Sequence, residues 1–352
     1  MGQEHLQNHP GTTRVAEDPV VVCAADNGFV MPLAVAVRSV VTNLDPRRKL
    51  TLFVLDGGIS GENRRRLEQS WEMDRLVVHW IRPDLEALRD LSVSDQVTIA
   101  AYFRILIGKM LPNDVRKVIY LDCDLVVLGD LGLLWDQPME GRHCLAVQDV
   151  ASPYFDSEQA LPDFPRRAPY LAAVRPVMNY RELGIRGQAK YFNSGILVID
   201  LARWRQENLT DQLLDCLHQN REHVLWWDQY ALNVVLAGKW GELDPRWNQL
   251  AMIHTFPSWQ TSPLDEATYR RIVREPWIVH FASPSKPWHY GNSHPRRDLY
   301  FQYLDQTAWA TWRPKRPPFS LSEWQYARIR RWRSLCGRQY RKLKTHLLRR
   351  SA

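Results

Sequence analysis

The apolar residues of this chain form short continuous runs that alternate with amphipathic stretches. Residues 20–25 are apolar throughout, which is typical of a strand buried on both faces of a parallel sheet. Residues 31–42 then show helical periodicity, and further strands are predicted at 50–55 and 76–81, with a helix at 61–71 between them. Strands that alternate with helices predict an α/β fold in which helices flank a mostly parallel sheet.

The alternation continues less regularly beyond residue 90. Residues 151–188 are rich in proline and arginine, and we interpret them as a long, partly irregular insertion near a site. The remaining pattern predicts helices at 98–111 and 227–238, and strands at 115–121, 144–148, 195–201 and 277–281.

The two ends of the chain differ from this globular part. Residues 1–18 are polar and without periodicity, so we expect them to be disordered, and they contain no apolar core of a secretory signal. Residues 19–312 are interpreted as one domain and residues 313–352 as a separate basic tail. No stretch of the chain approaches the roughly 18–20 apolar residues that a membrane-spanning helix needs.

Positive charge is concentrated in the tail. Residues 313–352 carry thirteen Lys or Arg and one acid, Glu323, so the tail has a net charge of +12 within a chain of +7. Its apolar residues recur every three or four positions and predict an interfacial helix on an anionic membrane surface. The alternatives are a helix that packs on the protein's own core or one that binds nucleic acid without specificity; no specific nucleic-acid partner is predicted. The apolar positions are Ile329, Trp332, Cys336, Tyr340, Leu343 and Leu347.

Composition bounds the class and the compartment. The 352 residues are 45% hydrophobic and 24% charged, which is ordinary for a globular protein with a sizeable core. The five cysteines are scattered, odd in number and without a CxxC pair, which favours reduced thiols in the cytoplasm. Together with the tail, this predicts a cytoplasmic protein peripherally associated with the inner face of the cytoplasmic membrane.

The sharpest chemical signal is Asp122-Cys123-Asp124, directly after the very apolar strand at 115–121. In extended backbone, residues i and i+2 point the same way, so the two carboxylates are expected to converge at the edge of the sheet where open α/β folds bind ligands. Two close carboxylates repel each other unless a cation lies between them, and oxygen ligands suit Mg²⁺ or Mn²⁺. The alternative is a solvated turn with two surface acids.

Residues 117–127, which contain this pair, resemble the metal-binding strand of family 8 glycosyltransferases. Six further segments resemble motifs of that family in the same order, and the resemblance covers about residues 20 to 310. It implies a GT-A fold and a retaining transfer of a hexose from a UDP-sugar, as in the family's bacterial lipooligosaccharide and lipopolysaccharide α-galactosyltransferases and α-glucosyltransferases. The six segments are Ala24-Ala25-Asp26, residues 54–60, Tyr102-Phe103-Arg104, and residues 191–197, 227–233 and 280–288.

The resemblance assigns a metal site. It implies Asp122, Asp124 and His280 as ligands, and the mixed oxygen and nitrogen set favours Mn²⁺, with Mg²⁺ as the alternative. A histidine at the end of a strand is more often structural. Lys286 is expected to bind the diphosphate and stabilise the leaving UDP; the alternative is an ordinary surface lysine.

The resemblance also implies nucleotide and sugar contacts. Ala24, Asp26 and Cys123 are expected to bind the nucleotide, although Asp26 is equally suited to cap the following helix. Five side chains that both donate and accept hydrogen bonds are expected to bind the donor hexose. The structural alternatives are a salt bridge on a helix face for Arg104, a turn for Asn193 and a helix cap for Asp228. The five residues are Arg104, Asp149, Asn193, Asp228 and Gln229.

Asp228 and Gln229 are the predicted catalytic residues. In this family the position of a nucleophile holds an amide, matched here by Gln229, and an amide oxygen is a poor nucleophile. We therefore favour a front-face reaction, in which the acceptor hydroxyl attacks on the side from which UDP departs, over double displacement. The acceptor is expected to be an oligosaccharide or glycolipid, such as the core oligosaccharide of a lipopolysaccharide. The alternative functions are a metal-dependent nucleotide-sugar hydrolase and a non-catalytic sugar-binding scaffold, and galactose and glucose stay open as donor sugars.

Overall fold

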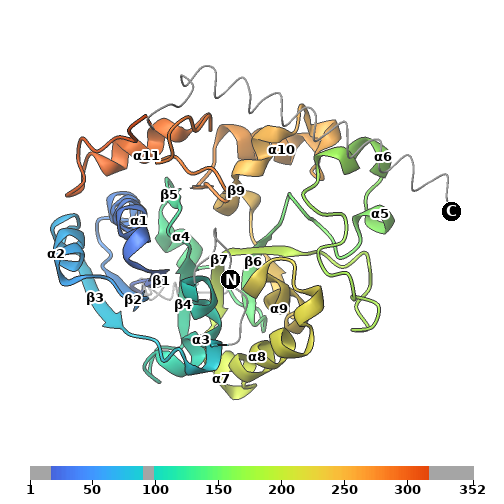
Figure 1. Ribbon diagram of the computed structural model, residues 1–352, viewed down its shortest axis with the longest axis horizontal. Coiled ribbons are helices and arrows are strands. Elements are labelled where there is room, and N and C mark those ends of the chain that lie inside the picture. Colours follow the sequence, from blue (N-terminus) through green and yellow to red (C-terminus); the bar gives the residue numbers. More distant parts are fainter. Residues whose placement is uncertain (1–16, 90–98, 317–352) are drawn as a thin grey trace, which may run out of the picture.

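A seven-stranded sheet forms the centre of the protein in the computed structural model, which describes residues 17–89 and 99–316 (Figure 1). Residues 1–16 and 317–352, where the disordered terminus and most of the basic tail were predicted, lie outside the described residues. The strand order is β3-β2-β1-β4-β7-β6-β8. The strands are β1 (Val20–Ala25), β2 (Leu50–Asp56), β3 (Leu76–Ile81), β4 (Lys117–Leu121), β6 (Cys144–Gln148), β7 (Phe192–Asp200) and β8 (Trp240–Glu242).

The sheet is mostly parallel, as the alternation of strands and helices predicted. β1 pairs in parallel with both β2 and β4, with Val21 opposite Leu52 on one side and Ile119 on the other. Only β7 runs against its neighbours in this sheet, because its pairs with β4 and β6 are both antiparallel. The carboxyl ends of β1, β4 and β6 therefore meet the amino end of β7 at one edge of the sheet.

Helices cover both faces of the sheet because successive strand residues point to opposite sides. Along β1, Val21, Cys23 and Ala25 belong to the core on one face, whereas Val22 belongs to the core on the other. The first core contains α1 (Val30–Asn43), α2 (Gly61–Gln69), α4 (Leu131–Trp135) and α11 (Arg297–Leu304). The second contains α3 (Phe103–Met110), α7 (Leu201–Gln206), α8 (Leu209–Gln219) and α9 (Trp227–Val235).

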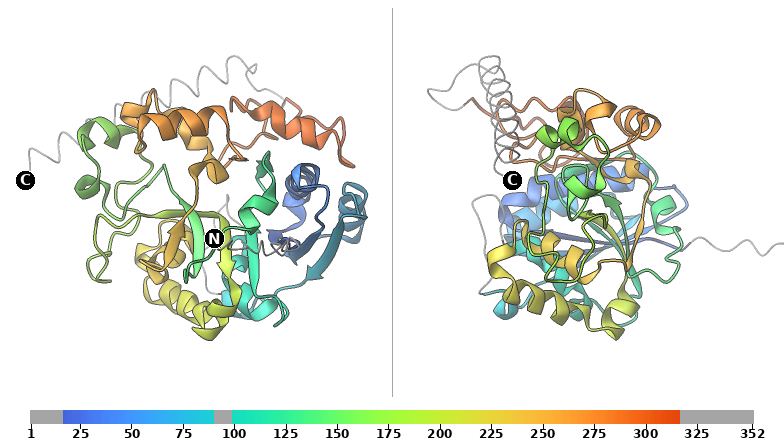
Figure 2. Two further views of the ribbon diagram at one scale, coloured as in Figure 1. Left: turned by 180° about the vertical axis from the view of Figure 1, so that it is seen from behind. Right: turned by 90° about the vertical axis from the view of Figure 1, so that its right-hand side faces the viewer.

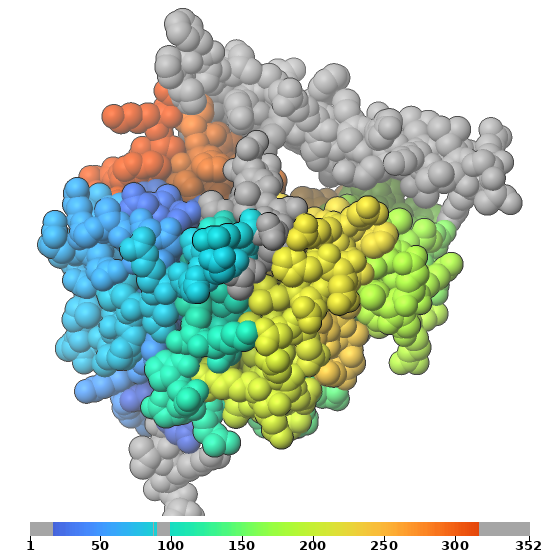
Figure 3. All heavy atoms as spheres, turned by 60° about the horizontal axis from the view of Figure 1, so that its bottom comes forward, coloured from blue at the N-terminus to red at the C-terminus, as the bar shows by residue number. Residues whose placement is uncertain are grey.

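The figures show the same layers in space. Helices α10 (Glu266–Arg274) and α11 lie at the opposite end of the molecule from α7 and α8 (Figures 1 and 2). On the face that Figure 3 brings forward, the yellow helices of the second core lie beside the teal segment that contains α3, with the blue N-terminal elements beyond it.

A second sheet of three short strands matters most for the site. It has the order β5-β10-β9, from β5 (Leu125–Val127), β10 (Ile278–His280) and β9 (Gln249–Leu250). β10 is antiparallel to β5 and parallel to β9. Because β5 starts immediately after Asp124, this sheet connects the end of β4 with segments more than a hundred residues away.

Several predicted boundaries were wrong. The helix predicted at 98–111 is divided within its described part, because Ile99–Tyr102 is a 3₁₀ turn and the α-helix starts at Phe103. The strand predicted at 195–201 starts at Phe192. The polar residues there had suggested a turn, but Asn233 receives the Phe192 N–H (2.8 Å) and donates to the Phe192 carbonyl (2.9 Å), which stabilises the strand. The helices predicted to extend to residues 71 and 238 end at Gln69 and Val235.

The predicted insertion at 151–188 is partly irregular, as expected, but it is packed. It contains two short helices, α5 (Ser157–Ala160) and α6 (Phe164–Arg167), and Leu161, Phe164 and Leu171 form a small apolar cluster of their own. Across 17–89 and 99–316, no helix combines the length and apolar character needed to cross a bilayer.

Candidate functional site

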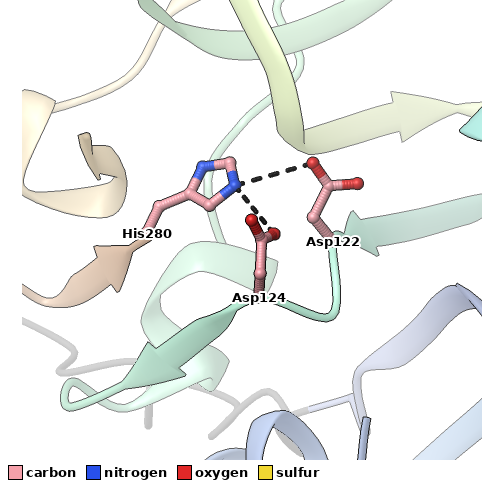
Figure 4. Close-up of side chains that lie close together, drawn as sticks. All are labelled: Asp122, Asp124 and His280. Atoms are coloured by element: carbon pink, nitrogen blue, oxygen red, sulfur yellow. Dashed lines mark hydrogen bonds and ion pairs between the residues drawn. The ribbon is translucent and has the colours of Figure 1, made fainter. Parts of the chain in front are cut away.

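The predicted metal ligands lie together. His280 is the last residue of β10, and the antiparallel pairing places it opposite Leu125, the residue after Asp124. Its Nε2 atom is 3.2 Å from Asp124 Oδ1 and 3.6 Å from Asp122 Oδ2 (Figure 4). One ligand atom from each residue lies within 4.8 Å of the others, and His280 is only 2% exposed. Asp124 and His280 are buried, so the solvated-turn alternative does not describe this cluster, and metal binding there stays a prediction.

The reason for the convergence differs from the one predicted. β4 ends at Leu121, so Asp122 and Asp124 lie in a bend between β4 and β5 and not in extended backbone. Alternation along a strand therefore does not bring the carboxylates together. The bend turns both side chains toward His280, and the Gly195 carbonyl supports it by accepting the Asp122 N–H at 2.8 Å.

The ionisation of Asp124 depends on its neighbours Lys286 and His280. Burial by itself raises the pKa of Asp124, but Lys286 and His280 outweigh burial and hold that pKa well below its usual range. The Lys286 ammonium forms an ion pair with Asp124 and donates to the Phe281 carbonyl (3.1 Å), and its side chain is 18% exposed. Lys286 is therefore part of the site and not an ordinary surface lysine.

The donor set fits a divalent metal ion. Two carboxylates and one imidazole supply hard oxygen and borderline nitrogen ligands at a shared position. Gly195 provides the room for this approach, because a Cβ atom there would lie 2.6 Å from Asp122 Oδ2 and would overlap the His280 ring. The absence of a side chain at Gly195 is thus a condition for the cluster.

Arg104 joins this cluster to a neighbouring group of buried polar side chains. Its buried guanidinium donates to Asp122 Oδ1 (2.8 Å) and to the Ser194 carbonyl (2.6 Å), and its Nε atom pairs with Asp228 Oδ2 (2.9 Å). Burial by itself lowers the pKa of Arg104, but Asp122 and Asp228 outweigh it and raise that pKa above the usual arginine value. The ion pairs cross between elements, so Arg104 is not a salt bridge on the face of one helix.

The other predicted sugar-binding residues form one buried network. Asp149 Oδ2 accepts from Asn193 Nδ2 (3.2 Å) and from Gln229 Nε2 (3.1 Å), and Gln229 Oε1 accepts the Ser194 N–H (3.0 Å). Burial raises the pKa of Asp149, although these hydrogen bonds oppose the change. Asp228 lies in the first turn of α9, whose cap residue is Trp226, so the helix-cap alternative is wrong for Asp228. The turn alternative is wrong for Asn193, which lies in β7.

The predicted nucleotide residues lie at the adjoining strand ends. Cys123 is buried, and its thiol donates to the Ala24 carbonyl at 3.2 Å, which connects the Asp122–Asp124 bend to the end of β1. Asp26 accepts the N–H groups of Gly28 (2.8 Å) and Phe29 (3.2 Å), so it does cap the following turn. The nucleotide contacts of Ala24, Asp26 and Cys123 stay predictions.

Two residues of the site were not predicted. Gly195 was noted only as part of a motif, and Asn248 was not noted at all, although its amide lies between His280 and Asn193 (3.0 and 2.9 Å). A lone asparagine in an irregular segment carries no periodic or spacing signal. Only the pairing of β9 with β10 places Asn248 beside His280.

Comparison with known proteins identifies the family of this chain. The sequence model of glycosyl transferase family 8 matches residues 20–292. The chain is 31% identical over 294 residues to general stress protein A of Bacillus subtilis, covering 83% of this chain and 94% of that protein. It is 24% identical over 290 residues to a lipopolysaccharide 1,3-galactosyltransferase of Salmonella typhimurium, covering 81% of this chain and 77% of that protein.

The solved structures give the fold. A crystal structure of the galactosyltransferase LgtC with donor and acceptor sugar analogues is similar to this chain, with a TM-score of 0.67 and 23% identity, covering 82% of this chain and 96% of that one. The two proteins share the GT-A fold. Since the match to the family's sequence model spans most of the chain and the fold agrees with it, this protein belongs to glycosyl transferase family 8 and is a glycosyltransferase.

Proposed function

We propose that this protein is a retaining hexosyltransferase that moves galactose or glucose from a UDP-sugar to a saccharide, in particular the core oligosaccharide of a lipopolysaccharide. The observation that carries the proposal is the cluster of Asp122, Asp124 and His280 beside the Lys286 ammonium. Such a cluster suits a metal-bound diphosphate. The lipopolysaccharide galactosyltransferase and a lipopolysaccharide 1,2-glucosyltransferase of Escherichia coli, also 24% identical, support this acceptor class.

The metal ligands, Lys286 and the buried polar residues would have separate roles in the transfer. Asp122, Asp124 and His280 would hold Mn²⁺, or Mg²⁺ in its place, and the ion would supply Lewis-acid stabilisation of the diphosphate charge. Lys286 would place a further positive charge at the leaving UDP. The buried groups around Arg104 and Asp149 would hold the hexose hydroxyls in one orientation, which lowers the barrier by positioning.

The bonding of Gln229 supports the front-face reaction. Its Oε1 atom accepts from the Ser194 N–H (3.0 Å), from Asn193 Nδ2 (3.2 Å) and from the Ser194 hydroxyl (3.3 Å). An oxygen with its lone pairs already directed at three donors is a poor nucleophile. Gln229 would therefore not attack the sugar. We propose that it acts within the polar network that surrounds the positive charge developing on the sugar, while Asp228 keeps Arg104 in place.

A donor and acceptor screen tests the function. UDP-galactose and UDP-glucose are incubated with truncated lipopolysaccharide cores, with Mn²⁺ and with a chelator, and both glycosylated product and free sugar are measured. We expect metal-dependent, acceptor-dependent transfer from one of the two donors. Release of free hexose at the same rate with and without acceptor would identify a hydrolase. Binding of sugar without turnover would identify a scaffold.

The acidic side of the pH profile is expected to follow Asp228. Burial raises the pKa of this carboxyl from 3.8 to about 6, the Asp122 charge adds to the shift, and Arg104 opposes it. Below that pKa the carboxyl is neutral and Arg104 loses a charged partner, so kcat/KM should fall about tenfold per pH unit below about 6. A bound divalent ion screens Asp122 and shifts this limb to lower pH. The Asp228→Asn variant should lose the limb; an unchanged limb in that variant would assign it to another group.

We further propose that the basic tail holds the enzyme at the inner face of the cytoplasmic membrane, near a glycolipid acceptor. The proposal rests on the sequence of residues 313–352, because residues 317–352 lie outside the described residues. Each basic side chain near an anionic surface contributes about 1 kcal/mol. Vesicles rich in phosphatidylglycerol should sediment the full chain and leave a chain ending at residue 312 in solution. Equal sedimentation of both would reject the proposal.

A further inference from the structure

We propose that Asn248 is a positioning residue that fixes the tautomer and the orientation of His280 and connects the metal site to the donor-sugar residues. Asn248 is 3% exposed and ends the 3₁₀ turn Pro245–Asn248, directly before β9. β9 pairs with β10 so that Leu250 lies opposite His280. The inference rests on the proposed metal-dependent transfer, and it adds a residue with no expected contact to metal or substrate.

The amide of Asn248 is bonded at both ends. Its Oδ1 atom is 3.0 Å from His280 Nδ1, and its Nδ2 atom donates to Asn193 Oδ1 at 2.9 Å. His280 Nε2, on the other side of the ring, faces the carboxylates of Asp122 and Asp124. Asn248 therefore holds the edge of the imidazole ring that lies away from the predicted metal position.

The direction of each hydrogen bond follows from one backbone group. The Gly195 N–H donates to Asn193 Oδ1 at 3.1 Å, which identifies that atom as the oxygen, and Asn193 Nδ2 donates to the Asp149 carboxylate at 3.2 Å. Asn193 Oδ1 must therefore meet the NH₂ group of Asn248. The oxygen of Asn248 is then directed at His280, and only a proton on Nδ1 makes a hydrogen bond there.

With Nδ1 protonated, His280 can offer the Nε2 lone pair to an ion held between the two aspartates, which is the state that a metal ligand requires. Without an ion, Nε2 lies 3.2 Å from Asp124 Oδ1, within hydrogen-bond distance. The opposite tautomer would force the Asn248 amide to rotate, and its oxygen would then face Asn193 Oδ1 without a proton between them. Because Asn193 Nδ2 also donates to Gln229 Oε1 (3.2 Å), the same chain reaches the predicted catalytic amide. A change at Asn248 should thus alter metal binding and sugar binding together.

Three variants separate these effects. Asn248→Leu removes both hydrogen bonds while keeping a side chain of similar volume. Asn248→Asp keeps an acceptor for His280 but loses the donor to Asn193. Asn179→Leu is the matched control. Asn179 is also buried (5% exposed) and bonded at both ends, to Asn220 (2.7 Å) and to the Tyr230 hydroxyl (2.7 Å), but it touches neither site. Mn²⁺ binding is measured by calorimetry without donor, and kcat and KM for the donor are measured with saturating Mn²⁺.

We expect Asn248→Leu to weaken Mn²⁺ binding by about 10- to 100-fold. Asn248→Asp should bind Mn²⁺ at least as tightly as the wild type but raise the donor KM by about tenfold, with a smaller change in kcat. Asn179→Leu should change neither constant. If Asn248→Leu binds Mn²⁺ with an affinity within about twofold of the wild type, and the wild type is active, this inference is overturned and the proposed function stays intact.

A second measurement does not depend on metal loading. In metal-free protein labelled with ¹⁵N-histidine, NMR at pH 8 should show His280 with a proton on Nδ1, assigned by the signal that Asn248→Asp retains and His280→Gln loses. An unprotonated Nδ1 overturns the inference. If the wild type binds no Mn²⁺, the proposed function fails, and the tautomer still decides the role of Asn248.

Discussion

Replacement of Asp124 by Asn is expected to abolish Mn²⁺ binding and to lower the transfer rate by about 10³-fold, which corresponds to roughly 4 kcal/mol in the barrier. The Asp124 carboxylate lies 3.2 Å from His280 Nε2 and also pairs with Lys286, so it contacts another proposed metal ligand and the ammonium proposed to act on the diphosphate. The amide keeps the shape of the side chain but loses its charge. Calorimetry with Mn²⁺ and steady-state rates measure the two effects.

The loss of charge at Asp124 also has a stability component that can be separated. The pKa of Asp124 lies well below its usual range in the folded protein, so the ionised carboxylate stabilises the fold above the unfolded pKa, and this contribution is lost as the pH falls through the folded pKa. At neutral pH the Asn variant lacks that contribution. Thermal unfolding should therefore show a lower midpoint for Asp124→Asn, while circular dichroism at 25 °C shows a folded protein.

Asp200→Asn is the matched control. Asp200 is the last residue of β7, and it lies at the opposite edge of the sheet, paired with Lys117 at the start of β4. It caps α7 by accepting the Arg203 N–H at 2.9 Å, and asparagine caps helices equally well. Its rate and Mn²⁺ affinity should stay within about twofold of the wild type. Transfer by Asp124→Asn at a rate near that of the wild type, or unaffected by chelator, would refute a metal-dependent mechanism.

The Gly195→Ala variant is expected to lose about 10²-fold in activity or more, although the added group is one methyl. That methyl would lie 2.6 Å from Asp122 Oδ2 and would overlap the His280 ring, so at least one predicted metal ligand must move. The backbone is equally restricted, because the Gly195 carbonyl accepts the Asp122 N–H and its own N–H donates to Asn193. The effect should appear as weaker Mn²⁺ binding, measured by calorimetry, with a smaller change in the donor KM at saturating Mn²⁺.

Gly61→Ala provides the comparison for this variant. Gly61 starts α2, and the nearest atom to an added Cβ is Arg65 Nη1 at 4.0 Å, so the methyl has open space. Because alanine is the better helix former, this variant should be as stable as the wild type or slightly more so and fully active. If Gly195→Ala kept the Mn²⁺ affinity of Gly61→Ala, the packing of Asp122 and His280 around Gly195 would not matter for the metal site.

The fold class and the Asp122–Asp124 pair could be predicted from residue patterns because both leave local signals. A strand buried on both faces leaves a continuous apolar run, and β1 and β3 have the predicted bounds of Val20–Ala25 and Leu76–Ile81. Asp122 directly follows β4, Asp124 directly precedes β5 and His280 ends β10, and the structure brings these three predicted ligands together. The resemblance to a family added the ligand roles, which no single short motif supports.

Other features depend on contacts between distant segments, and these leave no periodic signal in the chain. The antiparallel direction of β7 and the three-stranded sheet that carries His280 arise from pairing between segments that are not adjacent in the chain. The start of β7 at Phe192 was missed because its polar residues Asn193 and Ser194 are bonded by residues distant in the chain, such as Gln229. Asn248 and the space at Gly195 acquire their importance solely from what packs against them. Local patterns thus predict which elements form and where charge gathers, whereas burial and hydrogen bonding between those elements decide which side chains are held in position.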